Sequence, residues 1–136
     1  MRTIAIANQK GGVGKSTLAV HLVWLARELA IPALLIDLDG QANSTRTFVD
    51  SPDVTALSAS MLFTLDPQEA TALPARIDAE TWLIPADLDV NDLEALSLSV
   101  VGRPVEHLAR IARHLPRGVL AVIDTPPNLG RRLIGA

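Results

Sequence analysis

Apolar residues in this chain fall into short continuous runs that are separated by polar loops. Four of the runs predict buried strands, at residues 3–7, 33–37, 81–86 and 118–124. They are apolar almost throughout rather than alternating, as parallel strands covered on both faces require.

Two longer segments have the spacing of amphipathic helices. Residues 16–30 carry apolar side chains at positions 18, 19, 22, 25, 26 and 29, and Pro32 follows. Residues 104–115 begin with a proline and repeat apolar positions at helical spacing. A further helix is predicted at 90–99, a polar loop at 40–53, and short helices near 56–63 and 67–73. The succession predicts an α/β fold, a mostly parallel sheet flanked by helices on both faces, in a single domain over residues 1–136.

The amino-acid composition limits the kinds of covalent link, metal site and binding partner. The absence of cysteine excludes disulfides, cysteine-ligated zinc and iron–sulfur clusters. A net charge of −3 gives no global attraction to nucleic acid or to an anionic membrane. The most apolar region, residues 18–36, is broken by charged residues and a proline before it could span a bilayer, so we expect a cytoplasmic protein. Trp24 and Trp82 are expected in the core.

The segment "NQKGGVGKST", residues 8–17, joins the first strand to the first helix. Its glycines let the backbone wrap around an anion, and the helix that follows directs its first N–H groups at phosphates. Lys15 would reach the β and γ phosphates, and the Ser16 hydroxyl would bind Mg²⁺. The residues expected to hold the nucleotide are Lys10, Gly11, Gly12, Val13, Gly14, Lys15, Ser16 and Thr17.

This loop departs from the usual phosphate-binding pattern, because Gln9 stands where a glycine is standard. It also holds both lysines of the chain, Lys10 and Lys15, among twelve basic residues. With counts this small the clustering can arise by chance. We favour the interpretation that compact point charges are needed at this place.

Three acids follow predicted strands. Asp37 and Asp39 come after the second strand, and Asp124 ends the fourth. The carboxyl ends of parallel strands meet at one edge of a sheet, which is also where the glycine-rich loop lies. Asp124 fits the Walker B role at Mg²⁺. Of Asp37 and Asp39, one could face the metal and the other the attacking water.

Four segments together resemble the ParA/MinD group of P-loop ATPases with a deviant Walker A motif, and most of all ParA-type partition proteins. They are "KGGVGKST", "LLIDLDGQANST", "LIPADLDVNDLE" and "VLAVIDTPPNLG". The resemblance implies a P-loop NTPase-type sheet, ATP or ADP with Mg²⁺ as cofactors, and a homodimer that sandwiches the nucleotides. It also implies a ParB-like centromere-binding partner and non-specific DNA binding on the nucleoid, with no membrane contact.

The resemblance further implies roles for single residues. Lys10 would reach the phosphates bound by the partner subunit, so the catalytic set would be Lys10, Lys15 and Asp39. Asp39 would position the water, while Asp37 would be a Mg²⁺-side or a structural acid. The metal set would therefore be Ser16, Asp37 and Asp124, and Thr125 would begin the loop that senses the γ phosphate.

The chain departs from the family pattern in three ways. Gly40-Gln41-Ala42 replaces Pro-Gln-Gly, and Ser16 replaces a threonine. The third departure is length, since such proteins continue well beyond the D-T-P-P motif, so the sheet is expected to be incomplete at its C-terminal end. We therefore expect ATP binding more firmly than turnover. The alternative is a catalytically inactive nucleotide-binding regulator of a full-length ParA partner.

Arginines recur around the last predicted helix, at positions 103, 110, 113 and 117, and Arg131 and Arg132 follow further along the chain. Arg103, Arg110 and Arg117 are spaced by seven residues, which places them on a similar helical face if the helix covers all three. Such a face could contact DNA, although a solvated face is the commoner outcome. No role is assigned to the three histidines.

Overall fold

Five strands form one sheet in the computed structural model, which describes residues 1–53, 55–95 and 97–127. The strands are β1 (Arg2–Ile6), β2 (Ala33–Asp37), β3 (Ala75–Arg76), β4 (Thr81–Ile84) and β5 (Leu120–Asp124). Their order across the sheet is β1-β5-β2-β4-β3, and all pairs are parallel except β3 with β4. The predicted, mostly parallel sheet is confirmed.

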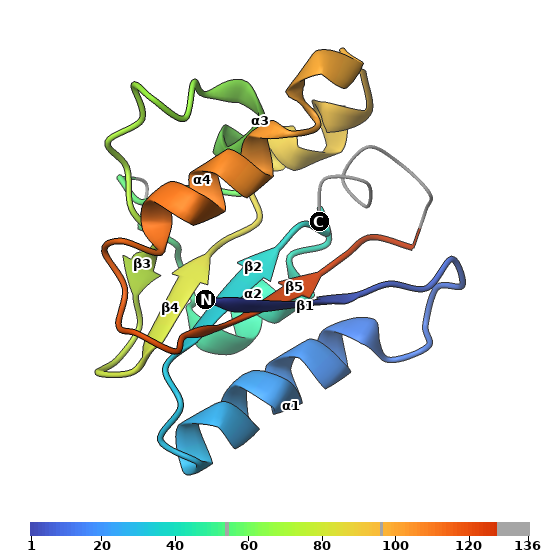
Figure 1. The fold of residues 1–136 in the computed structure, drawn as a ribbon. Helices are drawn as coiled ribbons and strands as arrows, with labels where there is room; N and C mark the ends of the chain where they lie inside the picture. Colours follow the sequence, from blue (N-terminus) through green and yellow to red (C-terminus); the bar gives the residue numbers. More distant parts are fainter. Residues whose placement is uncertain (54, 96, 128–136) are drawn as a thin grey trace.

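Helices cover both faces of this sheet (Figure 1). On one face lie α1 (Lys15–Glu28) and α2 (Asn43–Phe48); on the other lie α3 (Met61–Thr64), the 3₁₀ helix η1 (Leu88–Ala95) and α4 (Arg103–Ile111). A second 3₁₀ turn, η2, spans Leu98–Val100.

Alternate residues of each central strand belong to different halves of the core. Leu34 and Ile36 of β2 pack in the cluster that contains α3 and α4 residues. Ala33 and Leu35 pack with α1. This double burial explains why the strands are apolar throughout rather than alternating.

Several local predictions were wrong. The expected polar loop at 40–53 contains α2, and the expected helix at 67–73 is a turn followed by irregular chain. The expected helix at 56–63 shrinks to α3. In place of the α-helix expected at 90–99, the described residues form the 3₁₀ helices η1 and η2. The two-residue strand β3 had no sequence signal.

β1 is an edge strand and is not buried as predicted. It pairs with β5 on one side, and its residues are exposed or half-buried, Ile4 among them. Trp24 is likewise 41% exposed instead of lying in the core. Trp82 is partly buried against the larger core cluster, close to the prediction.

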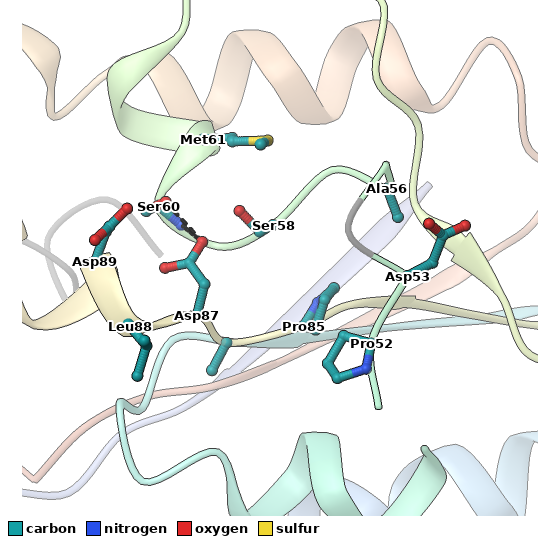
Figure 2. Close-up of a pocket in the computed structure, with 11 residues that line it drawn as sticks. Pro52, Asp53, Ala56, Ser58, Ser60, Met61, Pro85, Asp87, Leu88 and Asp89 are labelled. Carbon is teal, nitrogen blue, oxygen red and sulfur yellow. Dashed lines mark hydrogen bonds between the residues drawn. The ribbon is translucent and has the colours of Figure 1, made fainter. Parts of the chain in front are cut away.

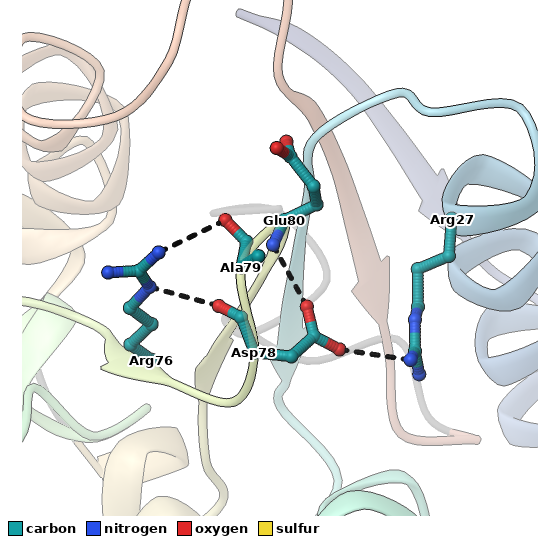
Figure 3. A network of polar contacts seen from close by, with 5 residues as sticks. All are labelled: Arg27, Arg76, Asp78, Ala79 and Glu80. Carbon is teal, nitrogen blue, oxygen red and sulfur yellow. Dashed lines mark hydrogen bonds and ion pairs between the residues drawn. The ribbon is translucent and has the colours of Figure 1, made fainter.

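A polar network ties α1 to the hairpin between β3 and β4 (Figure 3). Arg27 at the end of α1 forms an ion pair with Asp78 at 3.2 Å, and Arg76 donates to the backbone oxygens of Asp78 and Ala79. These residues precede β4, so the network lies at the opposite end of the strands from the glycine-rich loop. Since both partners of the ion pair are substantially exposed, it contributes about 0–1 kcal/mol.

The arginines of α4 do not form the predicted outward face. Arg103 donates to the backbone oxygens of Phe63 and Thr64, and Arg110 donates to that of Ala72. Arg117 lies beyond the end of α4. Two of the three arginines are therefore held against the protein's own backbone, and Arg131 and Arg132 lie outside the described residues.

Within the part of the chain that the structure describes, none of the helices combines the length and the apolar character that a membrane crossing needs.

Candidate phosphate-binding site

The glycine-rich loop leaves β1 and enters α1 around an open hollow. Gly12 and Gly14 have φ of 72° and 84°, in the left-handed region where a side chain would be strained. Apart from the adjoining residues, no atom of the described chain lies within 4 Å of where a Cβ would stand on either residue. Lys15, the first residue of α1, is only 8% exposed. The loop is thus shaped around free space at a helix N-terminus, where backbone N–H groups attract an anion.

The hollow has a volume of about 430 Å³. Its lining comprises Gly11, Gly12, Gly14, Lys15, Ser16, Thr17, Asp39, Gln41, Asn43 and Pro127. Most of the predicted nucleotide residues are therefore brought together, and Asp39 lines the same hollow. Lys10 and Val13 are exposed and lie outside this lining, and the backbone N–H of Lys10 donates to Asn8 Oδ1 at 2.9 Å.

Two of the predicted acids lie side by side at the ends of β2 and β5. Asp37 and Asp124 are partners in the parallel register of β2 and β5, and both are fully buried. As predicted, the strand-end acids gather at the carboxyl edge of the sheet. Each carboxylate has a different set of partners.

Asp37 is satisfied by the backbone and by one hydroxyl. Its Oδ2 accepts from the Thr45 N–H and the Thr45 hydroxyl, each at 2.8 Å, and its Oδ1 accepts from the Asp39 N–H at 3.1 Å. Burial raises the pKa of Asp37 to about 6; the Thr45 hydrogen bonds oppose that rise and the charge on Asp124 adds to it. Both oxygens are thus occupied within the protein.

Asp124 is satisfied on one oxygen only. The Ser44 hydroxyl donates to Oδ2 at 2.6 Å, whereas Oδ1 is buried and accepts no hydrogen bond from any residue that the structure describes. Burial raises the pKa of Asp124, and the hydroxyls of Ser44 and Ser16 together with the charge of Lys15 act in the opposite direction. An unpartnered carboxylate oxygen near a hydroxyl and a lysine suits an oxygen-preferring cation such as Mg²⁺.

The rest of the cation's ligands would have to come from elsewhere. Among the described residues, no group of three or more His, Cys, Asp or Glu side chains is placed to hold a metal. Mg²⁺ commonly binds through one or two protein groups plus phosphates and water, so this donor set fits a metal that arrives with a nucleotide.

Sequence reasoning missed Ser44. It lies in α2, which was predicted as loop, and no residue pattern marks it. In the next position, Thr45 Oγ1 also accepts from the Ala86 N–H at 3.0 Å, so α2 is joined to the ends of β2, β4 and β5. Thr125 similarly donates its hydroxyl to the Ile6 oxygen at 2.7 Å, which joins the loop after β5 to the end of β1.

A second hollow lies beyond the end of β4 (Figure 2). It measures about 370 Å³, and its lining comprises Pro52, Asp53, Ala56, Ser58, Ser60, Met61, Pro85, Ala86, Asp87, Leu88 and Asp89. Ser60 donates to Asp87 at 2.6 Å inside it. Its described lining includes three aspartates and no basic side chain, so it is unsuited to a polyphosphate.

Comparison with known proteins agrees with the geometry of the loop site. A family model described as an AAA domain matches residues 1–136, the whole chain. The chain belongs to this family. Named relatives place it within the ParA/MinD group of AAA-domain proteins, as the motifs predicted.

Protein IncC of Escherichia coli is 35% identical over 145 residues, covering 100% of this chain and 38% of IncC. The chromosome partitioning protein ParA of Caulobacter vibrioides is 31% identical over 143 residues, covering 100% of this chain and 52% of that protein. This AAA-domain chain therefore spans about half or less of the length of these relatives.

The fold also matches solved structures. The cobyrinic acid a,c-diamide synthase of Mycobacterium smegmatis, solved with a bound ATP analog and magnesium, superposes with a TM-score of 0.80 at 29% identity. The match covers 99% of this chain and 55% of that one. The P-loop fold is thus shown over nearly all of the chain, and the ligands of that structural neighbour are an ATP analog and magnesium.

Proposed function

We propose that this chain is the nucleotide-binding part of a ParA-like, Mg²⁺-dependent partition ATPase. The observation that carries the proposal is the open hollow between the glycine-rich loop and Asp39, backed by the buried Asp124 with one unpartnered oxygen. ParA and Soj relatives support the proposal, and so do the structures of a neighbour with an ATP analog and magnesium and with ADP and magnesium. The proposed ligand is therefore Mg·ATP or Mg·ADP.

The residues of the site then divide by role. Lys15 and the N–H groups of residues 11–17 bind the phosphates, and Ser16 with Asp124 holds Mg²⁺. The bound cation would neutralise charge on the phosphates. Asp37, whose oxygens are occupied by Thr45 and Asp39, serves as the structural acid of the pair.

Hydrolysis would need two further groups. Asp39 borders the hollow and is placed to orient a water molecule. Lys10 is exposed outside the hollow, which agrees with action on the nucleotide of a partner subunit in a sandwich homodimer. Turnover therefore depends on dimerisation, whereas binding does not.

The partners follow from the relatives and are also proposals. A ParB-like centromere-binding protein and non-specific DNA are expected for the assembled ATPase in the cytoplasm. Since Arg103 and Arg110 are engaged with backbone oxygens, α4 offers less basic surface for DNA than the sequence suggested.

Isothermal titration with ATP in the presence and absence of Mg²⁺ tests the binding proposal. We expect saturable binding that Mg²⁺ strengthens and that Lys15→Ala abolishes, with Arg113→Ala as a surface control outside the site. A chain that is folded by circular dichroism but binds no ATP would refute the proposal.

A non-catalytic regulator is the second candidate. It is favoured by the outer edge of β1, which has no strand beside it among the described residues and could accept a strand of a longer ParA protein. Mixing this chain with a full-length ParA distinguishes the two. A regulator changes the ATPase rate of the longer protein at stoichiometric ratios, and an unchanged rate rules this candidate out.

A further inference from the structure

The buried contact between Ser44 and Asp124 joins α2 to the end of β5. Both residues are fully buried, and their 2.6 Å hydrogen bond spans 80 positions in the sequence. A short hydrogen bond from a hydroxyl to a carboxylate is among the stronger kinds in proteins. It fixes Oδ2 of Asp124, while Oδ1 of the same carboxylate has no hydrogen-bond partner in the described part of the chain.

We propose that Ser44 is a positioning residue that orients the Asp124 carboxylate for the cation of a bound nucleotide. A carboxylate that is free to rotate about its Cβ–Cγ bond could direct either oxygen toward the cation, or neither. Holding Oδ2 removes that freedom, as partners of metal ligands do in established metal sites. This inference rests on the proposed nucleotide-binding function.

The residues on either side of Ser44 also contact parts of the proposed site. Asn43 lines the phosphate hollow, Ser44 holds Asp124, and Thr45 holds Asp37. Three successive residues of α2 thus contact the nucleotide space, the metal-side acid and the structural acid. The position of α2 and the orientation of Asp124 are therefore coupled, because a shift of the first turn of α2 would break the Ser44 bond.

A purely structural role for Ser44 would lead to a different experimental result. If the hydroxyl only stabilised the fold, its removal would lower stability and weaken nucleotide binding equally with and without Mg²⁺. A positioning role predicts a loss confined to the Mg²⁺-dependent part of binding.

The experiment measures binding of a fluorescent ATP analogue to the purified chain, first in EDTA and then across a Mg²⁺ titration. For Ser44→Ala we expect Mg²⁺ affinity to fall about 10- to 100-fold, the range typical for loss of a partner of a metal ligand. Affinity for the analogue in EDTA should stay near that of the wild type. Ser44→Thr keeps the hydroxyl and should retain most of the Mg²⁺ affinity.

Thr47→Ala is the matched control. Thr47 lies in the same helix, is exposed, and donates its hydroxyl to the Asn43 oxygen rather than to an acid. It should leave both affinities unchanged. If Ser44→Ala does not fold, Ser44→Cys replaces it, and its weaker donor should give an intermediate loss of Mg²⁺ affinity.

The outcomes separate the two proposals. Wild-type Mg²⁺ affinity in Ser44→Ala, or an equal loss with and without Mg²⁺, would overturn the role of Ser44 and leave the proposed function intact. Failure of the wild-type chain to bind the analogue under either condition would overturn the proposed function, and the role of Ser44 with it.

Discussion

The two lysines of the glycine-rich loop have different surroundings and should have separable effects. Lys15 is nearly buried at the start of α1, whereas Lys10 is exposed outside the hollow. We expect Lys15→Ala to abolish Mg·ATP binding. Lys10→Ala should leave binding close to wild type but reduce hydrolysis by about 10³-fold or more in an assembled dimer, as expected for a charge supplied in trans.

Equilibrium binding of ATP and steady-state phosphate release measure the two effects. Lys10→Arg serves as a control that keeps the charge but changes its shape. Equal loss of ATP binding in both alanine variants would contradict the assignment of Lys10 to the partner's site.

The buried Asp37 makes the stability of the nucleotide-free protein depend on pH. Its pKa rises from 3.8 in the unfolded chain to about 6 in the fold. Between these values the folded state binds more protons, so rising pH favours unfolding. The stabilising contribution of Asp37 to the free energy of unfolding is present below pH 4 and is lost as pH rises through about 6. The loss amounts to at most about 3 kcal/mol.

Urea denaturation of the wild type and Asp37→Asn from pH 4 to pH 7 tests this dependence. The free energy of unfolding of the wild type minus that of the variant should fall as pH rises, because the variant has no carboxyl group to titrate. Subtracting the two curves removes the opposite contributions of Asp53 and Asp78, whose pKa values are lowered. A difference that is constant with pH would contradict the prediction.

At the scale of elements, the C-terminal end of α1 contains a strained backbone conformation that a substitution can relieve. The Ile31 N–H donates to the Ala26 oxygen and the Ala30 N–H to the Arg27 oxygen, the two bonds of a Schellman motif. Ala30 occupies the left-handed position with φ of 53°, where glycine is usual. We expect Ala30→Gly to raise the free energy of unfolding by about 1 kcal/mol, since the left-handed conformation costs a residue with a Cβ about that much.

Thermal and urea denaturation measure the gain in the free energy of unfolding. Glu28→Gly, in a right-handed helical position two residues earlier, should instead lower stability by about 1 kcal/mol. Loss of stability in both variants would show that the Ala30 position is not strained.

The sequence predicted some elements better than others, because different interactions stabilise them. β2 and β5 were predicted because burial on both faces demands an unbroken apolar run. α2 was missed because it has little apolar periodicity and is held by Ser44 and Thr45 against two buried acids. The loop and its acids were predicted from their residue types, but the partner of each acid depended on tertiary contacts.

At the scale of the whole molecule, one edge of the sheet is open. β1 pairs only with β5, so the other side of its backbone has no strand beside it among the described residues. Leu18 and Leu25 of α1 and Leu29, the residue that caps its C-terminal end, are about half exposed or more. Their spacing places them on one helical face. An unpaired strand and exposed leucines on the adjacent helix favour association with another polypeptide.

We therefore expect the 136-residue chain to self-associate at micromolar concentrations and Leu25→Lys/Leu29→Lys to reduce this association. Both side chains are substantially exposed, so the double variant should change the free energy of unfolding by no more than about 1 kcal/mol. Leu88→Lys is the control, because Leu88 is 93% exposed but lies beyond β4, away from α1. Sedimentation velocity over a hundredfold concentration range distinguishes the species. A wild-type chain that stays monomeric throughout, or a Leu88→Lys variant that dissociates as readily as the α1 variant, would refute the assignment of this face.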